Sequence, residues 1–290
     1  MISRPYRSVL YIPGGREGAL NKARKIPADA IIFDLEDAVA VTEKVSARAT
    51  LVQQLLVGGY GRRTKIVRIN SLETTWGFSD IGAVAGTPPD VVLLPKVDTA
   101  KKVLELRLEM SKYESLNKTK IWAMMETPRG ILNAVEIADC PELDGMVMGT
   151  NDLAKDLNVR LDSTRGPMLT ALGLSILAAK AAGIIILDGV FNAFKDDAGL
   201  MLEAVQGRNL GFDGKTLIHP AQVDIVNNVF SPSPTEIELA HRQIEAFKAA
   251  SLNGEGVAVV DGKIVENLHI ETARATIEKS EVILDMERTR

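Results

Sequence analysis

Short apolar runs alternate with helix-like segments along almost the whole chain, and this alternation restricts the fold more than any other feature. The apolar runs lie at 8–12, 30–34, 65–70, 91–95, 121–125, 145–149, 184–188 and 216–219. Segments with helical periodicity separate them, such as 43–56, 101–112 and 165–182. Continuous apolar strands joined through helices pair in parallel, with both faces covered. Eight such units predict an α/β fold, a (β/α)8 TIM barrel.

A doubly wound open sheet is the structural alternative, because it also alternates strands with helices. Such sheets often bind dinucleotides through a GxGxxG turn after the first strand. Here the first strand is followed by "IPGGREGAL", which lacks that spacing. The dinucleotide-binding interpretation is therefore weak, and the barrel is favoured.

The barrel is predicted to occupy residues 1–230, and residues 231–290 form an extension that a barrel does not require. In "SPSPTEIELA", Thr235 is a candidate helix cap with Glu238 as its capping-box partner. "GVAVVDGKIVEN" predicts a β-hairpin that turns at Asp261–Gly262, and a last helix is expected over 270–284. We expect this extension to be a lid over the site or an arm for oligomerisation.

Composition excludes several classes of protein. A formal net charge of -4 and a pI near 5.6 argue against a nucleic-acid partner, which usually requires a basic surface. Cys140 is the single cysteine, so neither an internal disulfide nor a cysteine-rich zinc site is possible, which fits a reducing compartment. The N-terminal apolar stretch "VLYI" is too short for a signal peptide, and no run is long enough to span a bilayer. These features predict a soluble, cytoplasmic protein without a membrane partner.

Nearly every predicted strand ends on a polar or ionisable residue. In parallel barrels the active site forms at the carboxyl ends of the strands, so this enrichment predicts a site there. The residues at these ends are Tyr11, Asp34, Glu36, Asp37, Arg68, Asn70, Lys96, Glu126, Asn151, Asp152, Asp188 and His219. Three of the acids lie within four positions of "FDLED". Such carboxylates repel one another unless a cation or a substrate lies between them.

Glu126 and Asp152 follow neighbouring strands and have no histidine or cysteine beside them, a combination that suits a hard cation such as Mg²⁺. Alternatively, Glu126 caps the helix that begins near Pro128, and Asp152 is a first-turn acid favoured by the helix dipole. Arg68, at the end of an apolar strand, requires an anionic partner. That partner is either a substrate or the acids after the second strand.

Three further residues have equally open interpretations. Lys96 is either a substrate contact or part of an internal ion pair, and His219 is either structural or catalytic. Lys22 belongs to the basic stretch "GGREGALNKARK", which either meets phosphates at the barrel mouth or forms an ordinary solvated face.

A series of motifs covers essentially the whole chain from Arg7 to the final helix. They are "RSVLYIPGG", "DAIIFDLEDAVAVTEKVSARATL", "VRIN", "LLPKVDTA", "METPRGI", "GTNDLAKDL", "LGFDGKTLIHPAQVDIVNNVFSPSPTEIELA" and "GVAVVDGKIVE". In this order they resemble the citrate lyase beta-subunit family, part of the HpcH/HpaI aldolase and citrate lyase group that includes malyl-CoA and citramalyl-CoA lyases. The resemblance implies a (β/α)8 barrel, usually trimeric, that cleaves or forms a carbon–carbon bond in a 3-hydroxyacyl thioester with Mg²⁺.

The resemblance also implies roles for individual residues. Glu126 and Asp152 match the metal ligands, and Arg68 matches the arginine beside the thioester carbonyl. Tyr11 and Lys22 match positions that contact coenzyme A or substrate. Glu36 and Asp37 match the acid pair that supports the metal-bound waters and Arg68. One position departs from the family. "GKIVEN" carries Glu266 where family lyases usually have an aspartate that a neighbouring subunit delivers as an acid–base group. Either the backbone compensates for the added methylene or the reaction differs.

The resulting hypothesis is a Mg²⁺-dependent carbon–carbon lyase that cleaves a citryl-, citramalyl- or malyl-CoA type thioester by a retro-Claisen reaction. The products would be an acetyl thioester and a 2-keto acid or glyoxylate, with Arg68, Glu36, Asp37 and Glu266 catalytic. A first alternative is the lyase subunit of citrate lyase, acting on a thioester of an acyl carrier protein. A second is a non-catalytic subunit that binds coenzyme A. A homo-oligomer, trimer or hexamer, is expected.

Overall fold

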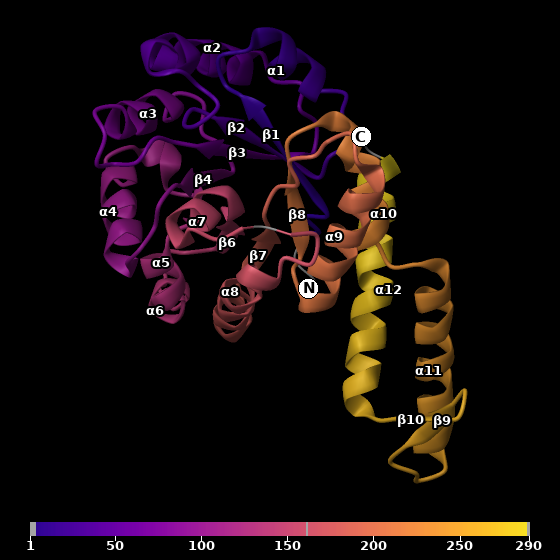
Figure 1. Cartoon of the computed structure of the whole chain (residues 1–290). Coiled ribbons are helices and arrows are strands. Elements are labelled where there is room, and N and C mark those ends of the chain that lie inside the picture. The colour runs from indigo at the N-terminus through magenta and orange to yellow at the C-terminus, as the bar shows by residue number, and fades with distance from the viewer. Residues whose placement is uncertain (1–3, 161, 289–290) are drawn as a thin grey trace. The chain divides into compact units, whose positions relative to one another are not determined.

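The computed structural model describes residues 4–160 and 162–288. Eight parallel strands close into a barrel in chain order, with β8 returning to β1 (Figure 1). The strands are β1 Ser8–Pro13, β2 Ala30–Asp34, β3 Thr64–Arg68, β4 Val91–Leu94, β5 Lys120–Met125, β6 Gly145–Met148, β7 Ile185–Asp188 and β8 Gly214–Leu217. The predicted TIM barrel is confirmed, and the open sheet is excluded.

Helices surround the strands as an outer layer (Figure 1). They are α1 Glu17–Ala23, α2 Lys44–Val57, α3 Gly77–Val84, α4 Ala100–Met110, α5 Pro128–Leu132, α6 Ala134–Ala138, α7 Thr150–Leu157, α8 Leu169–Ala182, α9 Asp197–Leu210 and α10 Val223–Phe230. Short 3-10 turns lie at Val41–Glu43, Glu114–Leu116, Gly166–Met168 and Pro220–Gln222. Because each strand leads into a helix through a loop at its carboxyl end, those loops meet at one end of the barrel.

Apolar side chains from all the strands except β8 form a packed cluster. Trp122 is the largest member, and its ring contacts Tyr6 edge to face at a centroid distance of 5.1 Å. Burial of one such Leu, Ile or Val side chain contributes about 1.5–3 kcal/mol. The barrel is thus a filled core, and a ligand can enter only where the strands end.

A second compact unit contains the C-terminal elements from Asn228 onward, whereas the barrel unit is Tyr6–Asn227. Its helices α11 Pro234–Leu252 and α12 Asn267–Arg288 pack together, and α11 contacts the hairpin of β9 Ala258–Val260 and β10 Lys263–Val265. Asp261 and Gly262 both have positive φ, 51° and 74°, as a tight two-residue hairpin turn requires. The predicted hairpin and helical extension are confirmed.

The predicted cap of α11 is wrong by two residues. Ser233, not Thr235, caps the helix, and Glu236 completes the capping box. Pro234 decides between the two, because proline suits the first helical position directly after a cap. Among the described residues, no helix has the length and apolar character needed to span a membrane.

Candidate active site at the carboxyl ends of the barrel strands

Asp34 organises the acidic loop that follows β2. It is the last residue of that strand and is 1% exposed. Its carboxylate accepts hydrogen bonds from the backbone N–H groups of Glu36 and Ala38, both at 2.9 Å. The same carboxylate therefore turns the chain back and places Glu36 and Asp37 beside it.

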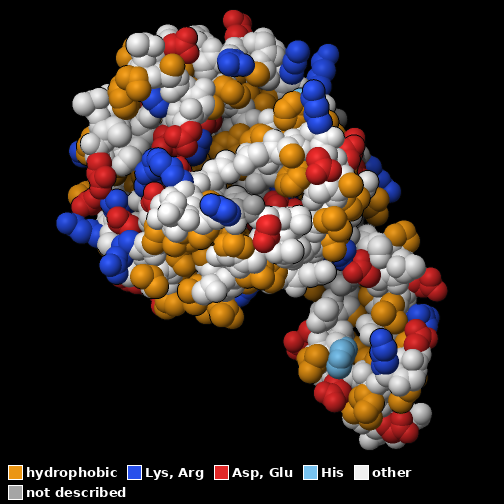
Figure 2. Space-filling model, in the orientation of Figure 1, with side chains coloured by type: hydrophobic (Ala, Val, Ile, Leu, Met, Phe, Trp, Pro, Cys, Tyr) orange, Lys and Arg blue, Asp and Glu red, His pale blue; other side chains and the backbone are white. Residues whose placement is uncertain are grey.

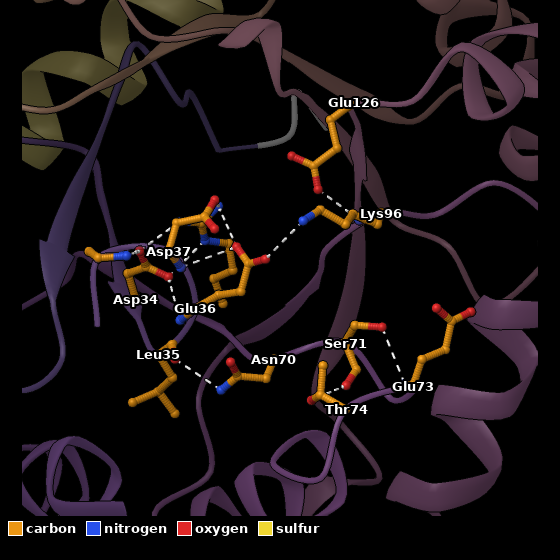
Figure 3. A network of polar contacts seen from close by, with 12 residues as sticks. Asp34, Leu35, Glu36, Asp37, Asn70, Ser71, Glu73, Thr74, Lys96 and Glu126 are labelled. Carbon is orange, nitrogen blue, oxygen red and sulfur yellow. Dashed lines mark hydrogen bonds and ion pairs between the residues drawn. The ribbon is translucent and has the colours of Figure 1, made fainter. Parts of the chain in front are cut away.

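Arg68 joins all three acids of this loop. The β2–β3 register pairs it with Asp34, and its guanidinium donates to both Asp34 oxygens, from Nε at 2.7 Å and from Nη2 at 2.6 Å. Nη1 lies 3.0 Å from a Glu36 oxygen and 3.3 Å from an Asp37 oxygen (Figure 3 shows the acids of this cluster). A two-point guanidinium–carboxylate contact is both strong and geometrically specific. The expected ion pair with the acids after the second strand is thus present.

The surroundings of these acids separate their pKa values. Burial alone would raise the pKa of Asp34, but the charge and hydrogen bonds of Arg68 hold it below its usual value. Burial, followed by the charges of Asp37 and Asp34, raises the pKa of Glu36 to about 7 against the opposing charge of Arg68. Asp34 is therefore a permanent anion, whereas Glu36 can exchange a proton near neutral pH. Acids with separated pKa values can take different catalytic roles.

Two buried groups hold the backbone of this loop in place. The Lys44 ammonium donates to the carbonyl oxygens of Leu35 at 3.0 Å and Glu36 at 2.8 Å. The Asn70 amide also donates to the Leu35 carbonyl, at 2.9 Å (Figure 3). The same amide donates to buried Asp80 at 2.7 Å. Sequence reasoning missed Lys44 and Asp80, because both lie in helical segments whose pattern gives no sign of a buried charge.

Glu126 lies directly after β5 and is 2% exposed. Its Oε1 accepts the backbone N–H of Lys96 at 2.7 Å (Figure 3). A side chain at Gly149 would collide with the Glu126 carboxylate, so the glycine after β6 makes room for it. Burial is the main cause that raises the pKa of Glu126 to about 7. Thr127, rather than Glu126, caps α5, which excludes the alternative capping role.

Asp152 lies in the first turn of α7 and is half-buried. It is therefore a first-turn acid, as the structural alternative proposed, but it also faces the site. Its charge contributes to the raised pKa of Glu126, and both side chains line one cavity. The two interpretations of Asp152 are compatible.

That cavity has a volume of about 310 Å³ and is open to solvent at the barrel end. Its polar lining includes Tyr11, Asp37, Arg68, Glu126 and Asp152. Figure 2 shows acidic and basic side chains side by side around a hollow on this face of the barrel. Asp34 and Asn151 also line the cavity, so the structure brings together seven of the residues predicted from the strand ends. Glu36 joins them through its contact with Arg68.

Tyr11, on β1, completes the wall on the Arg68 side. Its ring centroid lies 5.0 Å from the Arg68 guanidinium carbon, and its hydroxyl contacts the Met124 sulfur at 3.4 Å. Burial raises the pKa of Tyr11 above its usual value, although Arg68 opposes the shift. The phenol is therefore neutral and can donate a hydrogen bond.

Comparisons with known proteins show the family of the chain. The family described as HpcH/HpaI aldolase/citrate lyase matches residues 7–220. The chain belongs to this family. A (3S)-malyl-CoA thioesterase of Cereibacter sphaeroides is 57% identical over 281 residues, which are 97% of this chain and 96% of the relative. The citrate lyase beta subunit of Escherichia coli is 37% identical over 286 residues, 97% of this chain and 95% of the relative.

A solved structure resembles nearly the whole chain. CitE of Mycobacterium tuberculosis, in complex with magnesium, acetoacetate and coenzyme A, superposes with a TM-score of 0.80 at 29% identity and covers 96% of this chain and 98% of its own. The family, the fold and the prediction of an enzyme are confirmed.

The donor set of this family member suits a hard cation. Glu126 and Asp152 offer only carboxylate oxygens, and no cysteine or histidine accompanies them in the described lining of the cavity. Between residues 4 and 288, Leu161 excluded, no group of three or more His, Cys, Asp or Glu side chains is arranged to hold a metal. A cation held by this pair would keep water or ligand oxygens at its other positions, as Mg²⁺ commonly does.

Lys22, Glu266 and His219 are among the predicted residues outside the described lining of this cavity. Lys22 is exposed in the last turn of α1, so its predicted contact with coenzyme A stays a prediction. Glu266 belongs to the second unit, where its backbone N–H donates to His269 Nδ1 at 3.0 Å before α12. Its predicted catalytic role also stays a prediction. His219 Nδ1 accepts the N–H of Ala221 at 3.2 Å, a contact that agrees with the structural interpretation, and a catalytic role of His219 is not tested by it.

Proposed function

We propose that this chain is a Mg²⁺-dependent enzyme that acts on a malyl-type coenzyme A thioester, an acyl group with a 3-hydroxyl and an adjacent carboxylate. The observation that carries the proposal is the shared cavity of Arg68, Glu126 and Asp152. The cavity combines the two carboxylates proposed to bind a hard cation, those of Glu126 and Asp152, with the positively charged guanidinium of Arg68. The names of the relatives and the magnesium, acetoacetate and coenzyme A of the CitE structure support the same substrate class.

Glu126 and Asp152 would hold the metal, which would supply Lewis acidity toward the hydroxyl and carboxylate oxygens of the acyl group. Arg68 lies where negative charge would develop on the thioester oxygen. Its position is fixed by Asp34 before any substrate arrives. Preorganised charge of this kind usually supplies the largest catalytic contribution.

Two reactions place negative charge on that oxygen, and we infer that hydrolysis is the main one. In hydrolysis, water adds to the thioester carbonyl, a carboxylate of the Glu36–Asp37 pair accepts its proton, and the thiolate leaves. The pKa of Glu36, about 7, suits a general base at neutral pH. Relatives at 57% identity are named malyl-CoA thioesterases, against 37% for citrate lyase beta.

Retro-Claisen cleavage is the second candidate, favoured by the citrate lyase relatives. It breaks the C2–C3 bond and leaves an enolate whose carbon must be protonated. That step needs an additional acid, which the resemblance assigns to the position of Glu266. Hydrolysis needs no acid for carbon. The replacement of the usual aspartate by Glu266 therefore bears on cleavage alone, and it supports hydrolysis here.

Product analysis distinguishes the two reactions. The purified protein would be incubated with Mg²⁺ and malyl-CoA, and free thiol, malate, glyoxylate and acetyl-CoA would be measured. Hydrolysis yields malate and free thiol, whereas cleavage yields glyoxylate and acetyl-CoA without free thiol. Citramalyl- and citryl-CoA test the width of the substrate class. EDTA and the Glu126→Gln variant are the controls.

If the wild-type protein formed none of these products with Mg²⁺, the proposed enzymatic function would be wrong. A binding role for coenzyme A would then be favoured. Activity only on a thioester of an acyl carrier protein would favour the citrate lyase beta-subunit alternative. The predicted homo-oligomer would be tested by light scattering of the same preparation.

A further inference from the structure

Lys96 is a second cation of the site and lies between its two groups of acids. It follows β4, and its Nζ is 3.7 Å from Glu36 Oε1, while its backbone N–H holds Glu126 (Figure 3). The charges of Asp152, Asp37 and Glu126 also act on it. Acids that follow β2, β5 and β6 thus surround one ammonium group.

The two cations of the site differ in how fully their donors are used. Arg68 is buried and contacts Asp34, Glu36 and Asp37 at 2.6–3.3 Å. The Lys96 side chain is 47% exposed, and its described ion-pair partner, Glu36, lies beyond hydrogen-bond distance at 3.7 Å. The charge of Arg68 is balanced within the protein, whereas Lys96 retains donors for an incoming group.

The backbone of Lys96 is held in an unusual conformation. Its φ is 53°, in the left-handed region that residues other than glycine rarely adopt. The backbone N–H of Lys96 donates a hydrogen bond to Glu126, and its backbone carbonyl accepts one from the Lys102 ammonium at 3.2 Å. Lys102 is itself paired with Asp98 at 3.2 Å and Glu73 at 3.0 Å. This arrangement keeps the Lys96 side chain at the edge of the site.

We propose that Lys96 determines specificity for acyl groups that carry a carboxylate beside the 3-hydroxyl, by binding that carboxylate through its ammonium. The inference rests on the proposed function, because it concerns the acyl group in the same site. The site contains five carboxylates, on Asp34, Glu36, Asp37, Glu126 and Asp152, and would repel an anionic acyl group. A loosely held ammonium beside the metal ligands would offset this repulsion. Uncharged 3-hydroxyacyl groups would gain nothing from it.

The test compares binding of two small acids in the presence of Mg²⁺. Malate carries the carboxylate beside the hydroxyl, and 3-hydroxybutyrate has a methyl group in its place. Lys96→Gly removes the ammonium but retains the N–H toward Glu126, and glycine adopts the positive φ readily. Lys96→Arg retains the charge. Lys102→Met is the matched control, since it removes the hydrogen bond to the Lys96 carbonyl but retains the ammonium group of Lys96. Calorimetry would measure the dissociation constants of Mg²⁺ alone and of each acid.

In Lys96→Gly, malate binding should weaken by about 10- to 100-fold, the range of a lost charge-assisted contact. Binding of 3-hydroxybutyrate and of Mg²⁺ alone should be essentially unchanged. Lys96→Arg and Lys102→Met should retain the preference for malate. Equal weakening of both acids, or weaker Mg²⁺ binding that accounts for the loss of malate, would overturn the proposal. In those cases Lys96 would act only through Glu126.

This outcome is independent of the proposed function, because binding is measured without turnover. A wild-type protein that prefers malate but forms no product from malyl-CoA would refute the proposed reaction and leave the role of Lys96 supported. A protein that hydrolyses malyl-CoA, and whose Lys96→Gly variant keeps the wild-type preference for malate, would refute the role of Lys96 alone.

Discussion

Replacement of Glu126 by glutamine should abolish metal-dependent activity and at the same time stabilise the metal-free protein at alkaline pH. Glu126 is 2% exposed, and burial is the main reason why its pKa is about 7 instead of 4.5. At about 1.4 kcal/mol per unit of pKa, this difference corresponds to a free-energy cost of about 3 kcal/mol for burying the ionised carboxylate. Glutamine has no charge to bury, and its amide oxygen can still accept the N–H of Lys96.

The sign of the effect follows from the direction of the shift. Below the unfolded-state pKa, Glu126 is protonated in both states, and its raised pKa contributes its full stabilising effect there. As the pH rises toward 7, the unfolded protein ionises first, so this contribution is progressively lost. The glutamine variant lacks this loss. Its advantage over the wild type should grow by about 3 kcal/mol between about pH 4 and about pH 8.

Urea unfolding in EDTA, followed by the fluorescence of buried Trp122, would measure this difference at both pH values. Glu36, whose pKa is also raised, is present in both proteins, and its charge contributes to the pKa of Glu126, so the comparison measures the ionisation of Glu126 together with this coupling. Asp152→Asn is the matched control, because half-buried Asp152 should lose Mg²⁺ binding without the same gain in stability. A glutamine variant no more stable than the wild type at the higher pH would refute the argument from burial.

Three other substitutions test the remaining site residues. Asp152→Asn should nearly abolish turnover with the fold intact, and wild-type turnover at limiting Mg²⁺ would contradict the metal assignment. Arg68→Lys loses the two-point contact with Asp34, so kcat should fall by roughly 100-fold with a smaller change in KM; an effect on KM alone would place Arg68 in ground-state binding. Glu266→Gln should lower cleavage activity without loss of stability or oligomer size. Mixing it with Arg68→Ala subunits should restore some cleavage activity, and no recovery of cleavage after verified subunit exchange would exclude a role in a neighbouring barrel.

The barrel could be predicted because its strands are specified locally. A run such as 30–34 is apolar along its whole length, and only a strand covered on both faces explains that pattern. The carboxyl ends of parallel strands meet, so the polar residues that follow them had to converge. Glu126, Asp152 and Arg68 were found by this argument, and all three line the same cavity.

Strand β8 shows where local pattern fails. It begins at Gly214, two residues before the predicted start, because Lys215 is buried within the strand. Its ammonium contacts Asp188 at 3.0 Å and Glu203 at 2.7 Å. These partners come from β7 and α9, so no local rule reveals that the charge is compensated.

The sequence alone determined the class of fold, the end of the barrel that carries the site and the family. All three conclusions follow from short-range patterns or from the order of motifs along the chain. They do not depend on which distant residues come into contact. The tertiary structure decided how the charges are shared. Arg68 is balanced by Asp34, Glu36 and Asp37, whereas Lys96 stays at the rim with donors to spare. The pKa of Glu126 likewise depends on burial by segments distant in the chain. Burial and charge balance are properties of assembled surroundings, because the cost of an ion depends on everything that replaces its water.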